Sequence, residues 1–173
     1  LETPHTGNVS CLVWLSDGIH FISGGMDQRI ILWCIEQQGL GCSIKEVKRW
    51  NGIRVYDLVV LPGEETMIVA SDDKQLKTIS LIDHLQAPTL WCTESASITS
   101  LSLADKGKTL LVNLASDEIH AIDIKRMELL QRYLGHRHNH CFVTSSSGGF
   151  RDFFLASGSE DSQIYIWHRG QDR

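Results

Sequence analysis

The chain has 173 residues, of which 42% are hydrophobic and 21% are charged, and its formal net charge is −5 with a pI near 5.9. This length suffices for one domain with a hydrophobic core, and no apolar run approaches the roughly eighteen residues of a membrane span. The acidic balance disfavours binding to nucleic acid or anionic lipid, because both require a field of Lys and Arg.

Short alternating strands separated by Gly, Asp or Ser turns are predicted along the whole chain, in four consecutive units. The first two units have predicted strands at residues 9–15, 21–23, 30–35 and 44–50, then 55–61, 67–70, 76–82 and 89–92. The last two have them at residues 98–103, 109–114, 119–124 and 127–133, then 140–144, 153–156 and 164–167. We expect almost no helix, since the helix-favouring composition of 125–134 is overridden by its position as the fourth strand of a unit.

An internal repeat organises these strands. The segment from Ser23 to Trp33 recurs from Ser157 to Trp167, with weaker copies at 71–79 and 115–123. The first strand residues after the repeated turn are separated by 46, 43 and 45 residues: Ile30, Leu76, Ile119 and Ile164. A period in this range, with strand and turn signals inside each unit, indicates a propeller array.

The predicted fold class is therefore all-β, with four β-propeller blades in a single partial propeller over residues 1–173. The predicted blades occupy about residues 5–50, 51–93, 94–134 and 135–173, and the last is incomplete with three strands.

The units resemble the WD-repeat family, in which a loop His, a strand Ser or Thr, a turn Asp and a strand Trp form a buried hydrogen-bonded relay. The matching residues in the first unit are His5, Ser23, Asp27 and Trp33, and those in the fourth are His136, Ser157, Asp161 and Trp167. The middle units instead carry apolar residues at the Ser and Trp positions, namely Val69, Val112, Ile79 and Ile122. We expect apolar packing to replace the relay there.

Two chemical alternatives are disfavoured. A His, a Ser and an Asp could suggest a hydrolase, but the set occurs twice at repeat spacing and no Gly-x-Ser-x-Gly motif accompanies it. His138 and His140 could share a metal ion, but His136 is assigned to the relay and Arg137 disfavours a cation. Five cysteines without Cys-x-x-Cys spacing favour a reducing cytoplasmic or nuclear setting over disulfides or a zinc ribbon. We therefore expect no catalytic residues, no cofactor and no metal.

A narrower resemblance concerns the WD-repeat subunit of the CTLH/GID ubiquitin ligase. The segments that carry it are 9–15 with 21–27, 50–55, 155–161 and 164–168. The resemblance implies a scaffold or substrate-recruiting subunit for proteasome-dependent degradation, with other ligase subunits or substrates as partners. The alternative is a WD-repeat adaptor in another complex, in chromatin or trafficking. Fold alone is weak evidence for function.

The chain departs from that family because it carries no LisH or CTLH helices and no blades after Trp167. We expect it to be part of a larger ring, so that missing blades or self-association would cover its ends. The apolar residues expected to be bare at those ends are Leu12, Trp14, Ile22 and Ile31, or their neighbours. Loop or strand-end position makes five residues candidates for partner contacts: Arg29, Arg54, Tyr56, Arg137 and Phe150. The stretch Ser145–Arg151 is expected to be a long hairpin loop that binds a partner.

Overall fold

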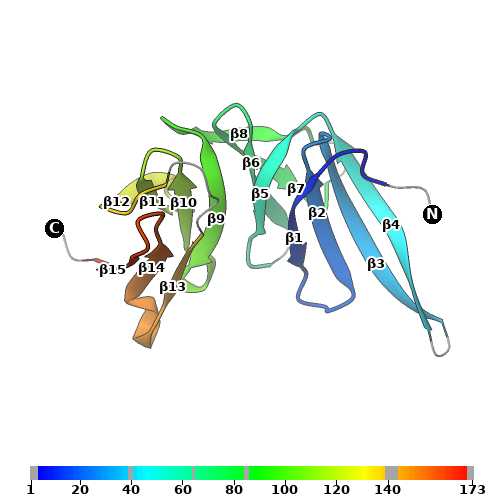
Figure 1. The fold of residues 1–173 in the computed structure, drawn as a ribbon. Coiled ribbons are helices and arrows are strands. Elements are labelled where there is room, and N and C mark those ends of the chain that lie inside the picture. Colours follow the sequence, from blue (N-terminus) through cyan, green and yellow to red (C-terminus); the bar gives the residue numbers. More distant parts are fainter. Residues whose placement is uncertain (1–3, 39–40, 64, 84–85, 139–143, 171–173) are drawn as a thin grey trace.

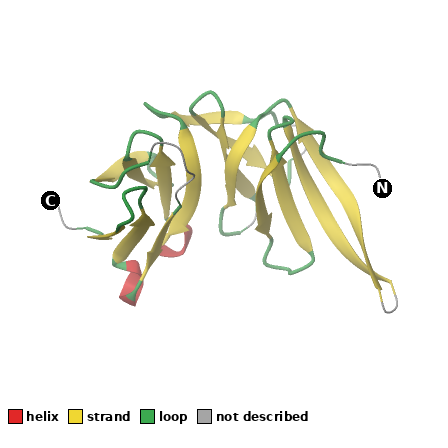
Figure 2. Ribbon diagram, viewed as in Figure 1, coloured by secondary structure: helices red, strands yellow, loops and turns green. Residues whose placement is uncertain are grey.

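Four antiparallel sheets follow one another along the chain and form an arc (Figure 1). The computed structural model describes residues 4–38, 41–63, 65–83, 86–138 and 144–170. Strands that are consecutive in sequence pair within each sheet, and short 3₁₀ turns are the only helical elements in this part of the chain (Figure 2). The predicted all-β fold is confirmed, including three four-stranded blades and a three-stranded last blade.

The first sheet contains β1 (Val9–Trp14), β2 (His20–Gly25), β3 (Arg29–Gln38) and β4 (Gly41–Asn51). The second contains β5 (Val55–Val60), β6 (Thr66–Ser71), β7 (Gln75–Ser80) and β8 (Thr89–Thr93). The third contains β9 (Ile98–Ala104), β10 (Thr109–Leu114), β11 (Glu118–Asp123) and β12 (Glu128–Leu134). The fourth contains β13 (Ser145–Gly148), β14 (Phe154–Gly158) and β15 (Ile164–His168). Two 3₁₀ turns, η1 (Asp105–Gly107) and η2 (Phe150–Asp152), connect the first and second strands of the last two sheets.

The first strand of the fourth sheet begins later than predicted. The strand expected at 140–144 lies outside the described residues except for Thr144, and β13 begins at Ser145. The prediction of a loop over Ser145–Arg151 is wrong for its first part, because Ser145 pairs with Ser157 and Gly148 with Phe154. Serine and glycine have weak strand propensity, but here a neighbouring strand supplies the backbone partners.

The first strands of the four sheets stand side by side at the inner edge of the arc. β1 contacts β5, β5 contacts β9, and β9 contacts β13. The later strands of each sheet lie progressively farther out, as β4 does on the right of Figure 1. This is the arrangement of consecutive propeller blades around a common axis.

The repeat phase is visible in the backbone of the turn between the second and third strands. One residue of this turn has a positive φ in every blade, at Gln28, Lys74, Asp117 and Ser162. These residues are separated by the 46, 43 and 45 residues that separate the repeats in the sequence. A left-handed conformation is unfavourable for a residue with a side chain, so its recurrence at one position shows that the turns are structurally equivalent.

Apolar clusters fill the three junctions between successive sheets. At the first junction Ile22 and Ile30 pack with Leu58 and Met67. At the second, Ile68 and Leu76 pack with Leu101 and Leu110. At the third, Leu111 and Ile119 pack with Leu155 and Trp167. Each fully buried Ile or Leu contributes about 1.5–3 kcal/mol, so these junctions dominate the stability of the array.

The two ends of the array expose apolar residues, only in part as predicted. Leu12 and Trp14 are more than half exposed, as expected for a bare sheet face. The prediction is wrong for Ile22 and Ile31, which are fully buried. Side chains alternate along a strand, and Ile22 points to the face that packs against the second sheet, while Ile31 lies opposite the buried Ser23.

At the other end, Ile164 is 78% exposed, although Ile30 at the same repeat position of the first blade is buried. No helix in the described residues has the length and apolar character needed to cross a bilayer.

A polar side chain also links each sheet to the next near the inner edge. The contacts are Ser10 Oγ to the Val55 carbonyl at 2.6 Å, the Leu101 N–H to Asp57 Oδ2 at 2.7 Å, and Asn113 Nδ2 to Ser145 Oγ at 2.8 Å. Asp57 Oδ1 also accepts from the Leu58 N–H at 2.8 Å. Burial raises the pKa of the Asp57 carboxyl although these two backbone donors oppose the shift.

We predict that Asp57→Ala lowers the free energy of unfolding by about 2 kcal/mol, because two buried backbone N–H groups lose their acceptor. Chemical denaturation measures the change. Asp72→Ala is the control, since the Asp72 side chain forms, within the described part of the chain, only an exposed ion pair with Arg54 at 3.3 Å. Its loss should change stability by no more than about 0.5 kcal/mol. Equal effects of the two substitutions would contradict the role of Asp57 as a link between blades.

Candidate functional site

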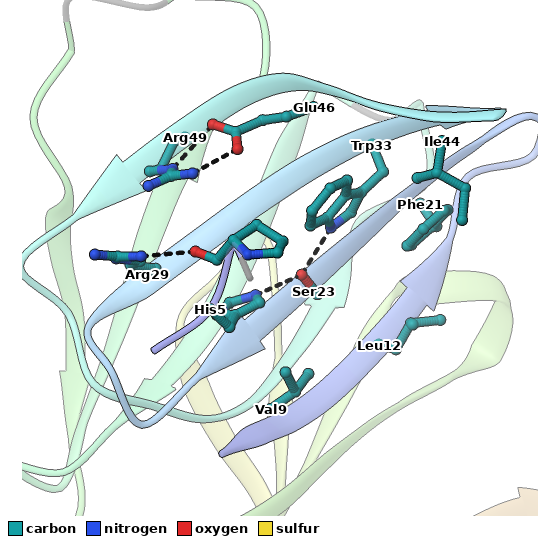
Figure 3. Close-up of a pocket in the computed structure, with 11 residues that line it drawn as sticks. His5, Val9, Leu12, Phe21, Ser23, Arg29, Trp33, Ile44, Glu46 and Arg49 are labelled. Carbon is teal, nitrogen blue, oxygen red and sulfur yellow. Dashed lines mark hydrogen bonds and ion pairs between the residues drawn. The ribbon is translucent and has the colours of Figure 1, made fainter. Parts of the chain in front are cut away.

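A hydrogen-bonded chain joins four side chains on the first blade. His5 Nδ1 lies 3.0 Å from Asp27 Oδ1, and His5 Nε2 lies 2.8 Å from Ser23 Oγ. The Trp33 indole N–H donates to the same Ser23 oxygen at 2.8 Å (Figure 3). The loop before β1, the second strand, the following turn and the third strand are thus held together by one connected set of bonds.

Donor and acceptor counting fixes the direction of these bonds. A carboxylate only accepts, so His5 Nδ1 donates to Asp27. The Nε2 atom of the neutral ring is then an acceptor, and the Ser23 hydroxyl donates to it while accepting from Trp33. With a neutral imidazole, every polar side-chain group in this set of four residues has a hydrogen-bond partner. The set ties the loop, the turn and two strands together, and the Trp33 indole N–H occupies a lone pair of the Ser23 oxygen.

The carboxyl group of Asp27 is held in its ionised form. Burial opposes ionisation, but the hydrogen bonds from His5 and from the Thr6 N–H outweigh it and lower the pKa of Asp27. Because the folded pKa is below the ordinary value, this contribution to stability is present above pH 3.8 and is lost as the pH falls through the folded pKa.

A hollow of about 860 Å³ lies beside the relay on the open face of the first sheet. Its lining combines aromatic and aliphatic side chains with a few charged ones: Pro4, His5, Val9, Leu12, Phe21, Ser23, Arg29, Trp33, Ile44, Glu46 and Arg49 (Figure 3). Arg49 pairs with Glu46 through two bonds of 2.9 and 2.5 Å. The hollow is therefore an apolar surface with a paired, charged rim.

The relay expected in the fourth blade is not closed, which corrects the prediction for His136, Ser157, Asp161 and Trp167. Ser157 Oγ donates to the Gly158 carbonyl, and the Trp167 indole donates to the Leu134 carbonyl at 3.1 Å. Asp161 accepts from the Tyr165 hydroxyl at 2.8 Å. Tyr165 stands at the repeat position of Ile31. The fourth blade therefore has a phenol hydroxyl that binds the turn carboxylate, whereas the first blade has an aliphatic side chain at that position.

His136 is nevertheless buried close to its expected partner. Its ring packs edge-on against Trp167 with the centroids 5.6 Å apart, and neither ring nitrogen has a hydrogen-bond partner among the described residues. Burial, followed by the neighbouring His138, lowers the pKa of His136. The ring therefore fills the position as a neutral aromatic group.

The middle blades pack apolar side chains at the relay positions. Val69, Ile79, Val112 and Ile122 are all buried. These residues belong to the clusters at the first and second junctions, where they replace polar bonds with apolar contact.

A polar network in the third blade was missed by the sequence analysis. The His120 ring lies between two carboxylates, with Nδ1 2.9 Å from Glu94 and Nε2 2.9 Å from Glu118. In the repeat phase Glu94 stands at the position of His5, and His120 at that of Ile31. The signal in the sequence is that Glu94 replaces the loop histidine of the relay. A search for His, Ser, Asp and Trp at the relay positions does not detect this replacement.

The five candidate contact residues lie on different blades. In the first blade the guanidinium of Arg29 donates to the Pro4 carbonyl at 2.7 Å. In the second, Arg54 pairs with Asp72, and the half-buried Tyr56 packs against the core. Arg137 is exposed after β12, and its backbone bonds to Ser159. Phe150 is 73% exposed in η2.

The histidine cluster yields no metal site in the part of the chain that is described. The rings of His136 and His138 are 6.5 Å apart, while His140 and Cys141 lie outside the described residues. Within those described residues, no three His, Cys, Asp or Glu side chains are placed to hold an ion.

Comparison with known proteins finds a family model that matches part of the chain, and relatives that match along most of it. The family model for the "WD domain, G-beta repeat" matches residues 2–34 and 127–168. The chain is 34% identical over 166 residues to the WD repeat-containing protein WDS homolog of Arabidopsis thaliana, covering 92% of this chain and 30% of that protein. It is 30% identical over 180 residues to GID complex subunit 7 of Schizosaccharomyces pombe, covering 97% of this chain and 33% of that protein.

A second Arabidopsis protein, a WD repeat-containing protein 26 homolog, is 34% identical over 165 residues, which cover 93% of this chain and 26% of that protein. The chain thus spans no more than a third of the length of these curated relatives. The crystal structure of the Cps50 (Swd1) β-propeller domain of Myceliophteria thermophila superimposes with a TM-score of 0.74 and 16% identity, covering 97% of this chain and 55% of that one. That likeness shows the fold.

We predict that Ser23→Ala lowers the free energy of unfolding by about 2 kcal/mol, because both His5 Nε2 and the Trp33 indole N–H lose their partner. Ser157→Ala is the matched control, since Ser157 has the same repeat position and its hydroxyl, among the described residues, bonds only to the adjacent Gly158 carbonyl. It should cost about 1 kcal/mol or less. Thermal and chemical unfolding of both variants provide the test. A larger loss for Ser157→Ala would show that the first relay is not the stronger of the two sites.

Proposed function

Because the chain is a WD-repeat protein whose sheets are propeller blades, we propose that it is a non-catalytic scaffold that binds other proteins. The relay of the first blade supports this proposal, since its His, Ser and Asp are all committed to structural bonds and its Trp completes them. The same residue types in a hydrolase would leave the serine oxygen free to attack a substrate.

At a finer level, we propose that the chain belongs to a scaffold or substrate-recruiting subunit of a CTLH/GID-type ubiquitin ligase. The observation that carries this proposal is the similarity to GID complex subunit 7, which extends over 97% of the chain and therefore over all four blades. On this proposal the ligase chemistry resides in other subunits, and the blades present surfaces to partners or substrates that are destined for the proteasome.

The exposed aromatic residues beside η2 are the best-supported partner contact. Phe150 and Phe153 lie with ring centroids 6.3 Å apart, and Phe153 stacks on His168 at 5.7 Å. The corresponding connections of the first and third blades carry polar residues, at 16–18 and 105–107. Exposed aromatic side chains on a connection between strands are typical anchors of protein interfaces.

Affinity purification of the tagged chain from cells tests both levels of the proposal. Recovery of GID or CTLH subunits supports the finer one. Recovery of a chromatin or trafficking complex instead contradicts the ligase assignment and retains the scaffold. Failure to recover any protein above a tag-only background contradicts both.

We predict that Phe150→Ala weakens binding to the recovered partner about tenfold, as expected when an aromatic anchor is lost, and leaves the melting temperature unchanged. Quantitative pull-down and thermal melting measure the two effects. Ile82→Ala is the control, because Ile82 is 64% exposed but belongs to the second blade. Undiminished binding by Phe150→Ala would remove the η2 aromatic residues from the interface.

A further inference from the structure

The third blade contains a histidine held between two acidic side chains, here called the Glu94–His120–Glu118 triad. Glu94 lies in the loop from β8 to β9, Glu118 begins β11, and His120 lies two residues further along β11. The side chains of His120 and Glu94 are each only 6% exposed, and that of Glu118 is 28% exposed. The triad therefore joins a loop between blades to the sheet of the next blade.

Donor counting gives the protonation state of the ring that this geometry requires when both carboxyl groups are ionised. Each ring nitrogen lies 2.9 Å from a carboxylate oxygen, and an ionised carboxylate can only accept a hydrogen bond. A neutral imidazole has one N–H and one lone pair, so it would satisfy one carboxylate and present a lone pair to the other. Both bonds form together when the ring is an imidazolium with two N–H groups. The first-blade relay is different, because Ser23 can donate to the lone pair of His5.

The surroundings of the ring favour the charged form. The bond to Glu94 raises the pKa of His120; burial opposes the shift, and the bond to Glu118 adds to it. Arg132 lies opposite His120 in the pairing of β11 with β12, and its positive charge lowers the pKa of His120. Cys92 Sγ lies 3.9 Å from Glu94. Burial is the main cause that raises the pKa of the Cys92 thiol, and the negative charge of Glu94 raises it further. On the other side, β10 presents the apolar Val112.

Backbone bonds show what the triad holds in place. The Glu94 N–H donates to the Lys74 carbonyl in the turn of the second blade at 2.9 Å. The Ala115 N–H in the turn of the third blade donates to the Ser97 carbonyl at 2.9 Å. The loop 94–97 thus spans the turns of two adjacent blades. Ala96 packs against the apolar core, and the polar attachment of Glu94 to the sheet runs through His120.

We propose that His120 is a pH-sensitive latch, which as an imidazolium fastens the loop 94–97 to the third blade and which releases that loop when it loses its proton. The equilibrium between the held and the released loop depends on pH because the pKa of His120 differs between the two states. A histidine whose pKa is higher in the folded protein than the ordinary 6.5 contributes its full stabilisation below pH 6.5. That stabilisation declines as the pH rises above 6.5 and is lost once the pH has passed the folded pKa. The loop should therefore be most firmly held in mildly acidic solution.

Nuclear magnetic resonance on the chain with labelled histidine tests the latch between about pH 6 and about pH 9. We expect the His120 ring to carry protons on both nitrogens at about pH 6.5 and to titrate above that value. In the same samples, opening of the loop should increase about tenfold per pH unit between 6.5 and the folded pKa. It is measured, after correction for intrinsic rates, from exchange of the Glu94 and Ala115 amides, which bond to the Lys74 and Ser97 carbonyls.

His120→Gln is the variant that removes the latch, because glutamine stays neutral over this range and can donate to only one side through its amide nitrogen. In this variant the loop should already open readily at about pH 6.5, with no further pH dependence. His20→Gln is the matched control, since His20 also pairs with a carboxylate, that of Asp17 at 2.5 Å, but at the surface. It should leave the loop unchanged.

Two results would overturn the proposal. One is a His120 ring with a single proton at about pH 6.5, and the other is a His120→Gln loop that keeps the pH dependence of the unmodified chain. If His120→Gln does not fold, the ring titration and loop exchange of the unmodified chain decide the question alone: titration of His120 without any change in loop opening contradicts the latch.

Discussion

Apolar contact between successive sheets is the constraint on which the rest of the structure depends. A single blade has two faces, and each face of an inner blade is covered only when a neighbour packs against it. The consequence is clearest in β6 and β10, the second strands of the two middle blades, which are almost entirely buried. Their side chains alternate between the junctions on either side, so that Met67 belongs to the first junction and Ile68 to the second. The blades are therefore mutually dependent, as expected for a repeat protein whose units contact only their neighbours.

Given that packing, the polar chemistry of each blade is free to differ. The first blade closes its loop with the relay of His5, Ser23, Asp27 and Trp33, in which the Ser23 hydroxyl can donate to the His5 ring. The third blade fastens the equivalent loop through His120, whose two bonds require a charge. The fourth blade buries His136 without bonds to its ring nitrogens. Histidines at the edges of different blades thus form hydrogen bonds with a hydroxyl donor, bonds with two carboxylates or simple packing, depending on which donors and acceptors surround each ring.

Much of the fold could be predicted from the sequence, because repeat spacing and strand alternation are local signals. The period located the turns correctly, and the four recurring left-handed residues confirm its phase. The signals failed where tertiary contacts decide. Ser145–Gly148 has a composition typical of a loop, yet it pairs with β14. The relay residues of the fourth blade are present in sequence, but the hydroxyl of Tyr165 engages Asp161 instead, and such a competition depends on side-chain geometry. One of the two partners of His120 is Glu94, twenty-six residues away, and no local pattern joins them.

Native-state hydrogen exchange over the strands of the four blades tests most directly whether the junctions hold the array together. Because the second and third sheets are covered on both faces, β6 and β10 should exchange slowest and through a single cooperative opening. The outer strands β4, β12 and β15 should open earlier. Independent opening of the four sheets, with β6 and β10 no better protected than β4, would contradict the account.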